Sequence, residues 1–237
     1  MSNFYTRVFD DYLSLAARLI PPVCLLCGDR ARFDGLCPGC RDSLPELSSQ
    51  RCPVCAVPNQ TADLCGRCLQ QQPAYDRVVA THLYDFPVNV LVHGLKYRGN
   101  LACARPLAAA LVAALDAEPY PDLVIPMPLS PARLRSRGFN QAMELARLAQ
   151  REFGFRIAAH GCRRIRDSVP QAALPWKERA RNVRGAFGCD LDLAGKSVAV
   201  VDDVLTTGAT LNELAVTLKR QGADKVVGWI VARTPPG

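Results

Sequence analysis

The stretch Ser197-Val-Ala-Val-Val-Asp-Asp-Val-Leu-Thr-Thr-Gly-Ala-Thr210 is the most informative part of this 237-residue chain for its fold. Its apolar run, 197–201, predicts a fully buried strand that ends in two carboxylates, Asp202 and Asp203. A short loop of hydroxyl-bearing residues and glycine follows, and a helix is expected over 210–221. A strand, a loop and a helix in this order are typical of an α/β sheet.

The same stretch has the features of a site for a phosphate and a diol. The helix N-terminus offers unpaired N–H groups and a positive dipole end to a phosphate, and Gly208 allows close approach of the backbone. The acidic pair is placed to accept hydrogen bonds from a diol, and phosphate and diol together describe a ribose 5-phosphate. A plainer interpretation is a helix N-cap at Thr210, with Glu213 three residues later. That interpretation explains the threonine but not two adjacent acids.

Alternating strand and helix patterns continue through the C-terminal two thirds of the chain. Further strands are expected at 77–84, 123–126 and 226–231, and further helices at 88–95, 105–117 and 140–153. The basic segment 156–187 shows neither period, so we expect it to be irregular or to form a hairpin. Strands separated by helices predict a mainly parallel α/β sheet.

Eight of the eleven cysteines form four Cys-x-x-Cys knuckles. Nine residues separate the knuckles within each pair and eleven separate the two pairs; the eight residues are Cys24, Cys27, Cys37, Cys40, Cys52, Cys55, Cys65 and Cys68. Two such turns complete a tetrahedral zinc site of four cysteines, so the spacing predicts two structural zinc ions. Sequential pairing of the knuckles is our first choice, and the spacing leaves crossed pairing open.

Other uses of these cysteines fit the sequence less well. Disulfides are rare in chains without an export signal, and a thioredoxin-like pair would follow a strand of a βαβ unit. The remaining Cys103, Cys162 and Cys189 are isolated in the sequence, and we expect them to be ordinary buried or half-buried residues.

The chain divides into three parts by sequence pattern. Residues 1–22 are predicted to form an N-terminal helix, because apolar residues recur at helical spacing over 4–19 before Pro21-Pro22. The double zinc ribbon is expected over 23–72, followed by the α/β domain over 73–237. No apolar run approaches the roughly 18 residues of a membrane span, and acidic residues interrupt the N-terminal apolar stretch. We therefore expect no membrane attachment and a cytoplasmic location.

Positive charge is concentrated in one segment. The chain has 29 Lys and Arg against 22 Asp and Glu, and residues 130–190 carry thirteen basic and five acidic side chains. This excess indicates either an anionic ligand or a solvated arginine-rich surface, and the composition leaves both open.

Several of these motifs resemble one protein family. Residues 197–210 are similar, at every defining position, to the 5-phosphoribosyl-1-pyrophosphate (PRPP) signature of type I phosphoribosyltransferases. The segment 126–141, with its core Arg137-Gly-Phe-Asn-Gln141, resembles the pyrophosphate-loop region of the ComF family, and 166–187 resembles its flexible loop. The motif over 93–99 and the double ribbon also fit this family. Ser168 stands where Thr is expected, which retains the hydroxyl.

The resemblance implies a type I phosphoribosyltransferase fold, a mainly parallel twisted sheet with helices on both faces. It implies that PRPP or another phosphoribosyl ligand binds with Mg²⁺, and that Asp202 and Asp203 contact the ribose. Arg133 and Arg137 would lie near the pyrophosphate and Arg179 in the closing loop, where cations neutralise the leaving group. The ligand-binding loop would comprise Val204, Leu205, Thr206, Thr207, Gly208, Ala209 and Thr210.

Three functions stay open at this point. The first is an enzyme that transfers phosphoribosyl from PRPP to an acceptor that the sequence does not identify. The second, implied by the resemblance, is a protein of natural transformation that handles single-stranded DNA beside other competence proteins. The third is a scaffold whose ribbons bind a protein partner. No side chain stands out as a general base, and His82, His93 and His160 are isolated and expected to be structural.

Overall fold

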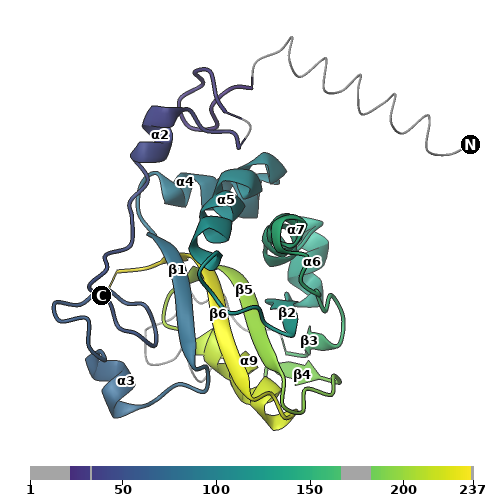
Figure 1. The fold of residues 1–237 in the computed structure, drawn as a ribbon. Coiled ribbons are helices and arrows are strands. Elements are labelled where there is room, and N and C mark those ends of the chain that lie inside the picture. Colours follow the sequence, from purple (N-terminus) through teal and green to yellow (C-terminus); the bar gives the residue numbers. More distant parts are fainter. Residues whose placement is uncertain (1–21, 33, 167–182, 236–237) are drawn as a thin grey trace, which may run out of the picture.

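The computed structural model describes residues 22–32, 34–166 and 183–235 (Figure 1). The expected N-terminal helix, Ser168 and Arg179 lie outside the described residues. The central sheet contains, in the order β1-β6-β5-β2, the strands β1 (Arg77–Leu83), β6 (Lys225–Arg233), β5 (Ser197–Leu205) and β2 (Leu123–Pro126). All three strand pairs are parallel, so the carboxyl ends of the four strands lie at one edge of the sheet.

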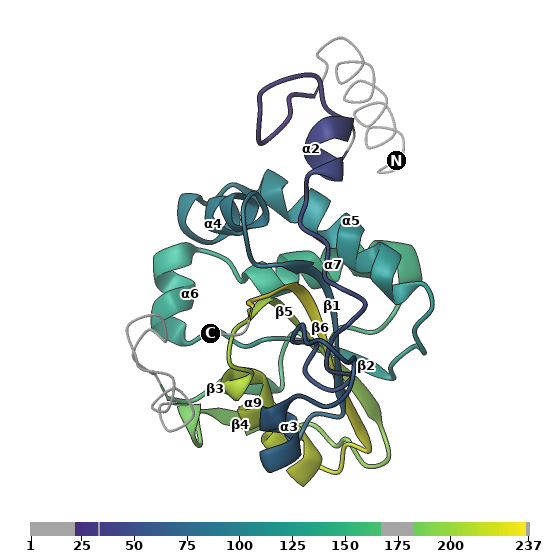
Figure 2. The ribbon, with the colours of Figure 1, turned by 90° about the vertical axis from the view of Figure 1, so that its left-hand side faces the viewer.

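Helices and a hairpin cover the two faces of this sheet (Figures 1 and 2). One face packs against α4 (Val88–Arg98), α5 (Ala104–Leu115) and α7 (Gln141–Phe153), with the 3-10 helix η1 (Leu101–Cys103) leading into α5. The other face packs against α9 (Ala209–Arg220) and the hairpin of β3 (Cys162–Arg164) and β4 (Phe187–Cys189). Eight of the nine residues of β6 are buried because both faces are covered. The predicted α/β class with a mainly parallel sheet is confirmed. None of the helices in the described part has the length and apolarity needed to cross a membrane.

Strand β5 is longer than the sequence pattern predicts. It extends to Leu205 because Asp202 and Val204 continue the parallel ladder opposite Ile230 and Ala232 of β6. Asp202 and Asp203 are therefore held inside a paired strand instead of following its end. Their backbone is fixed by the sheet, which gives the two carboxylates defined positions.

The segment 130–137 contains a helix, α6 (Pro131–Arg137), where a loop was expected. Ser130 is its N-cap and its hydroxyl oxygen accepts from the backbone N–H of Arg133, while Pro131 occupies the first helical position. Gly138 ends the helix in the left-handed conformation, with φ of 81°. The arginines of this segment therefore have a fixed helical spacing.

The two cysteine-rich ribbons lie on different faces of the sheet. The first contains α2 (Pro38–Asp42), and its Cys24, Leu36 and Leu44 belong to the apolar cluster of α4 and α5. The second contains α3 (Gly66–Gln70), and its buried cysteines join the apolar cluster of α9. Figure 1 shows α2 near α4 and α5, and α3 at the opposite end of the molecule.

The segment 45–47 between the ribbons pairs with the outer edge of β1. Leu47 N donates to Thr81 O at 3.2 Å, and Leu83 N donates to Pro45 O at 3.0 Å. Strand β1 is an edge strand of the sheet, so this short antiparallel pairing satisfies backbone groups that would otherwise be open. A domain boundary at residue 72 stays a prediction.

Candidate functional site

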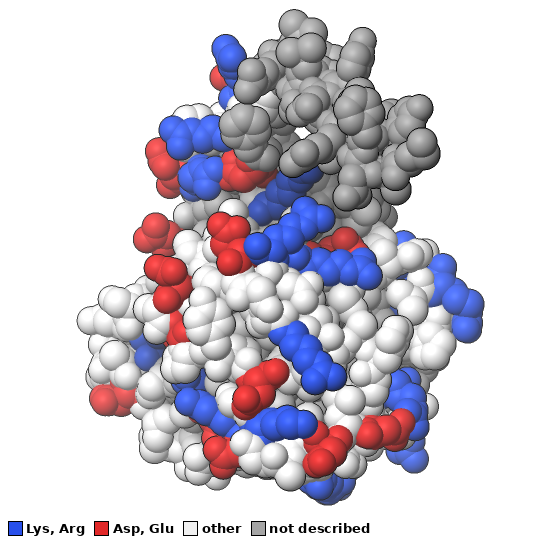
Figure 3. Space-filling model, turned by 45° about the vertical axis from the view of Figure 1, so that its right-hand side comes forward, with Lys and Arg blue, Asp and Glu red and all other residues white. Residues whose placement is uncertain are grey.

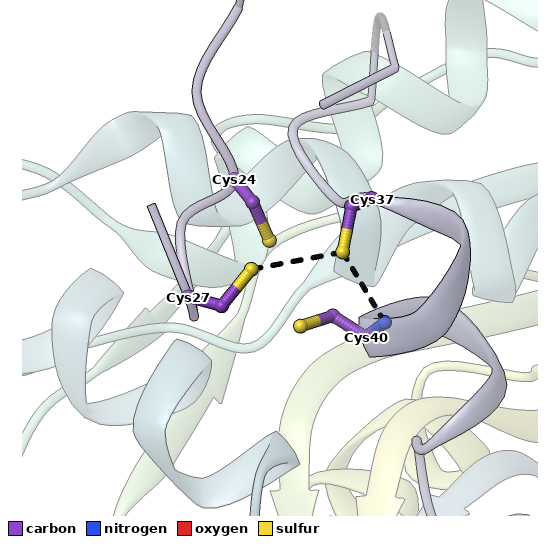
Figure 4. Close-up of side chains that lie close together, drawn as sticks. All are labelled: Cys24, Cys27, Cys37 and Cys40. Carbon is purple, nitrogen blue, oxygen red and sulfur yellow. Dashed lines mark hydrogen bonds between the residues drawn. The ribbon is translucent and has the colours of Figure 1, made fainter. Parts of the chain in front are cut away.

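The first cysteine group is formed by Cys24, Cys27, Cys37 and Cys40, whose sulfur atoms all lie within 4.8 Å of one another (Figure 4). The Sγ atoms of Cys27 and Cys37 are 3.7 Å apart, and the backbone N–H of Cys40 donates to Cys37 Sγ at 3.4 Å. Cys37 is also the N-cap of α2, which fixes the second knuckle. Four sulfur donors at this separation fit a tetrahedral zinc ion.

The second group contains Cys52, Cys55, Cys65 and Cys68, again within 4.8 Å of one another. The Sγ atoms of Cys55 and Cys65 are 3.6 Å apart. Three of its four cysteines are buried, against one in the first group, so the second site lies deeper in the protein. Both groups combine sequential knuckles, which confirms the sequential pairing and excludes the crossed one. The two four-cysteine sets are consistent with two structural zinc ions.

The first cysteine of each site has a lowered pKa. Burial raises the pKa of Cys24, but N–H groups of Cys27, Cys37 and Leu26 that donate to its sulfur outweigh burial and lower it to about 6. The pKa of Cys52 falls to about 7 for the same reasons. These N–H groups favour the thiolate, which is the form that binds zinc.

A pocket of about 870 Å³ opens at the carboxyl edge of the sheet. Such an edge is the usual place for ligands in open α/β sheets. Among the predicted residues, the pocket brings together Asp202, Asp203, Val204, Thr206, Thr210, Arg133 and Arg137. The other loop residues, Leu205, Thr207, Gly208 and Ala209, do not line it. The pocket is also lined by side chains to which the sequence assigned no role in a site: Tyr84, Lys96, Tyr97, Gln141 and Arg164.

The two acids of the pocket have a lysine as their counter-charge. Lys96 Nζ lies 2.9 Å from Asp203 Oδ1, and the backbone N–H of Asp203 donates to Asp202 Oδ1 at 2.9 Å. Burial and the neighbouring Asp203 charge raise the pKa of Asp202 to about 8, although Lys96 acts in the opposite direction. Asp203 Oδ2 is buried and has no hydrogen-bond partner among the described residues. A carboxylate oxygen in this state fits a ligand hydroxyl or a hard cation such as Mg²⁺.

Arginines form the opposite side of the pocket. Arg133 and Arg137 are four residues apart on α6 and therefore lie on one face of the helix. The guanidinium of Arg137 lies 5.7 Å from the centroid of the Tyr97 ring and donates to Gln141 Oε1 at 2.5 Å. Arg164, at the end of β3, is 7% exposed and lies over the Phe187 ring. Acids on the strand and bases on α6 thus face one space.

The loop before α9 places a helix N-terminus beside the acids. Gly208 is the N-cap, with φ of 82°, and Thr207 Oγ1 accepts from Ala209 N at 3.1 Å. The N-cap interpretation of Thr210 is wrong, because the helix begins at Ala209 and Glu213 accepts from the Gly185 N–H instead. Gly208 itself provides no side-chain cap for α9, and the hydroxyl of Thr207 accepts from the first N–H of the helix.

Cys103, Cys162 and Cys189 are buried or half-buried, as expected, and two of them lie together. Cys162 and Cys189 are directly opposite each other in the antiparallel β3–β4 pair, so they are not isolated in space. Burial and the adjacent Cys189 thiol both raise the pKa of Cys162. Of the histidines, His93 lines the pocket and contacts the ring of Tyr97 at a centroid distance of 5.1 Å.

Comparison with known proteins agrees with this architecture. Residues 15–69 match a family model described as a double zinc ribbon domain. DNA utilization protein YhgH of Salmonella typhi is 34% identical over 224 residues, covering 91% of this chain and 98% of that protein. Competence protein F of Haemophilus influenzae is 32% identical over 84% of this chain and 91% of its own length. Competence protein ComFC of Bacillus subtilis is 24% identical over 84% of this chain and 90% of its own length.

A weaker likeness concerns a solved structure described as the allosteric regulatory enzyme of purine biosynthesis. It has a TM-score of 0.33 and 22% identity over 52% of this chain and 24% of that chain, which is too low to support an argument. The relatives at 32 to 34% identity match along nearly the whole sequence, through both the ribbons and the α/β part. The chain therefore belongs to the ComF family.

Proposed function

We propose that the pocket at the carboxyl edge of the sheet binds PRPP, or another ribose 5-phosphate, together with Mg²⁺. The observation that carries the proposal is the meeting of three groups in one space. These are the acids Asp202 and Asp203, the N-terminus of α9, and the arginines of α6. A ribose 5-phosphate with a pyrophosphate at C1 offers a diol, a phosphate and a second polyanion in a matching arrangement.

Each group has a separate role in this proposal. The N–H groups at the start of α9 hold the 5-phosphate, and Asp202 and Asp203 accept from the ribose hydroxyls. Arg133 and Arg137 neutralise the pyrophosphate, and the family resemblance adds Arg179. Bound Mg²⁺ would lower the charge of the pyrophosphate, with the buried oxygen of Asp203 near it.

We propose transfer of the phosphoribosyl group as the reaction. The bond from C1 to the pyrophosphate oxygen breaks, and pyrophosphate leaves with the electron pair. A nucleophile of the acceptor forms a new bond to C1 and loses its proton.

The eight thiols of the zinc sites require a reducing compartment, which supports a cytoplasmic location.

Calorimetric titration with PRPP and Mg²⁺ tests the binding step. Asp202→Asn combined with Asp203→Asn should weaken binding at least about tenfold, since both ribose contacts change. Asp116→Asn, an exposed acid after α5, serves as the matched control and should leave binding unchanged. Equal affinity for pyrophosphate and for PRPP would contradict a ribose-phosphate site. Release of pyrophosphate from PRPP with candidate acceptors then tests transfer.

A second candidate function is the handling of single-stranded DNA with other competence proteins. The names of the relatives, DNA utilization protein and Competence protein, favour it. The α6 arginines could contact DNA phosphates in place of pyrophosphate. Among the described residues on the face shown in Figure 3, however, basic side chains are interspersed with acidic ones and form no continuous strip. DNA binding that PRPP displaces would place both ligands at the α6 arginines.

A further inference from the structure

The second cysteine site and the ligand-binding loop share one buried arginine. Arg233 is the last residue of β6 and is 1% exposed. Its Nε donates to the carbonyl of Cys55 at 3.0 Å, and its Nη1 donates to the carbonyls of Leu205 at 3.0 Å and Thr206 at 2.5 Å. One guanidinium therefore joins a zinc knuckle to the two residues that begin the loop.

A second arginine makes the same connection from the ribbon side. Arg67 lies in α3 between Cys65 and Cys68, and its Nη1 donates to the carbonyl of Thr207 at 2.8 Å. Three consecutive loop carbonyls, 205 to 207, are thus held by two arginines beside the second site. In a trans peptide the N–H points opposite to the C=O, so holding these carbonyls directs the following N–H groups away from the ribbon.

The linker after the second ribbon adds two contacts. Tyr75 is buried, and its hydroxyl oxygen lies 3.0 Å from the position a Cβ would take on Gly208. The backbone N–H of Ala74 donates to Asn212 Oδ1 in the first turn of α9 at 2.7 Å. The loop and the start of α9 therefore contact the linker as well as the second ribbon.

The negative charge of a zinc–thiolate site would stabilise the buried arginine beside it. The hydrogen bonds of Arg233 in the described part of the chain go to carbonyl and hydroxyl oxygens, so its positive charge is not balanced by a carboxylate there. A zinc ion with four thiolates carries roughly two excess negative charges, which would compensate the buried charge of Arg233.

We propose that zinc in the Cys52–Cys68 site holds the loop 205–208 in its ligand-binding conformation through Arg67 and Arg233. The pocket ligand and this zinc ion then stabilise each other, because coupling between two sites is reciprocal. The first site lacks this role, since Cys24 packs in the apolar cluster of α4 and α5. The loop part of the proposal stands on the contacts alone, whereas the ligand part rests on the proposed function.

Hydrogen exchange of the full-length chain without ligand tests the loop part. Cys52→Ser with Cys55→Ser should speed exchange of the amides over 205–210 about tenfold or more, and Cys24→Ser with Cys27→Ser should leave them within about twofold. Because the second-site variant could also unfold, Arg67→Ala provides a milder change at an exposed side chain. Its control is Arg41→Ala in α2, which removes an ion pair to Asp34 in the first ribbon. Equal effects of Arg67→Ala and Arg41→Ala on the loop amides would overturn the proposal.

Zinc release to a chromogenic chelator tests the reciprocal part. PRPP with Mg²⁺ should slow the release of one of the two zinc ions at least about threefold, and Arg67→Ala should abolish the effect. In the Cys24→Ser, Cys27→Ser variant only the second site holds zinc, and PRPP with Mg²⁺ should still slow the release of that ion. PRPP binding by calorimetry without any change in zinc release would overturn the reciprocal coupling. Absence of PRPP binding together with zinc-dependent loop exchange would contradict the proposed function and leave the loop coupling supported.

Discussion

Lys96 Nζ lies 2.9 Å from Asp203 Oδ1, and the two side chains are 18% and 3% exposed. Lys96 comes from α4 and Asp203 from β5, so this ion pair joins one helical layer to the sheet at the floor of the pocket. The burial of both partners makes it unlike the ion pairs on the surface, which contribute little to stability.

Removal of Lys96 should therefore be costly. Lys96→Met leaves the Asp203 carboxylate buried without its counter-charge, and we expect a loss of about 3 kcal/mol in the free energy of unfolding. Lys219→Met is the control, because Lys219 pairs with Asp76 at 3.0 Å on a partly exposed surface and should cost less than about 1 kcal/mol. Urea unfolding measures the loss in the free energy of unfolding for each variant. Similar losses in the two variants would contradict a buried ion pair.

The contribution of Asp202 to stability should fall as the pH rises from about 4 to about 8. The pKa of Asp202 is raised to about 8 in the fold, so in this range the folded state holds a proton that the unfolded chain has released. The slope from this group is at most about 1.4 kcal/mol per pH unit, and it ends above pH 8. Urea unfolding at several pH values, without Mg²⁺, measures it. Asp202→Asn should flatten the dependence and Asp116→Asn should not; an unchanged slope in Asp202→Asn would assign it to another group.

The purified chain should contain two zinc ions. Cys24→Ser with Cys37→Ser removes two ligands of the first site only, so elemental analysis should then find one zinc ion. A crossed arrangement would lose both ions in this variant. A value near zero in the unmodified protein, purified under reducing conditions without chelators, would contradict the zinc assignment.

The α6 arginines should differ in their effect on anion binding. Arg133 and Arg137 line the pocket whereas Arg135, on the same helix, does not. Arg133→Ala or Arg137→Ala should weaken PRPP binding about tenfold, and Arg135→Ala should leave it nearly unchanged.

For single-stranded DNA, the slope of log affinity against log salt should be about −0.7 for each neutralised phosphate. If DNA binds in the pocket, this salt slope should be smaller in Arg133→Ala and Arg137→Ala than in Arg135→Ala. The same salt slope in all three arginine variants would place the DNA site outside the pocket.

The parts of the fold that depend on local pattern could be predicted from the sequence. The apolar run of β5, the loop before α9 and the four knuckles each carry a short-range signal, and the structure contains all of them. The length of β5 could not be predicted, because its last residues are strand only through pairing with β6. Lys96 was missed as a site residue because its partner, Asp203, is more than a hundred positions away in the sequence. The same holds for Cys162 and Cys189, which become neighbours only when the hairpin forms.

The pairing of segment 45–47 with β1 has a consequence for any shortened version of the protein. A fragment that begins at residue 73 would retain the four-stranded sheet but lose the backbone partner of Thr81 and Leu83. The outer side of β1 would then offer free N–H and C=O groups to any other extended chain, including another copy of the fragment. Self-association of such a fragment would reflect its uncovered strand and would give no information about the oligomeric state of the intact protein.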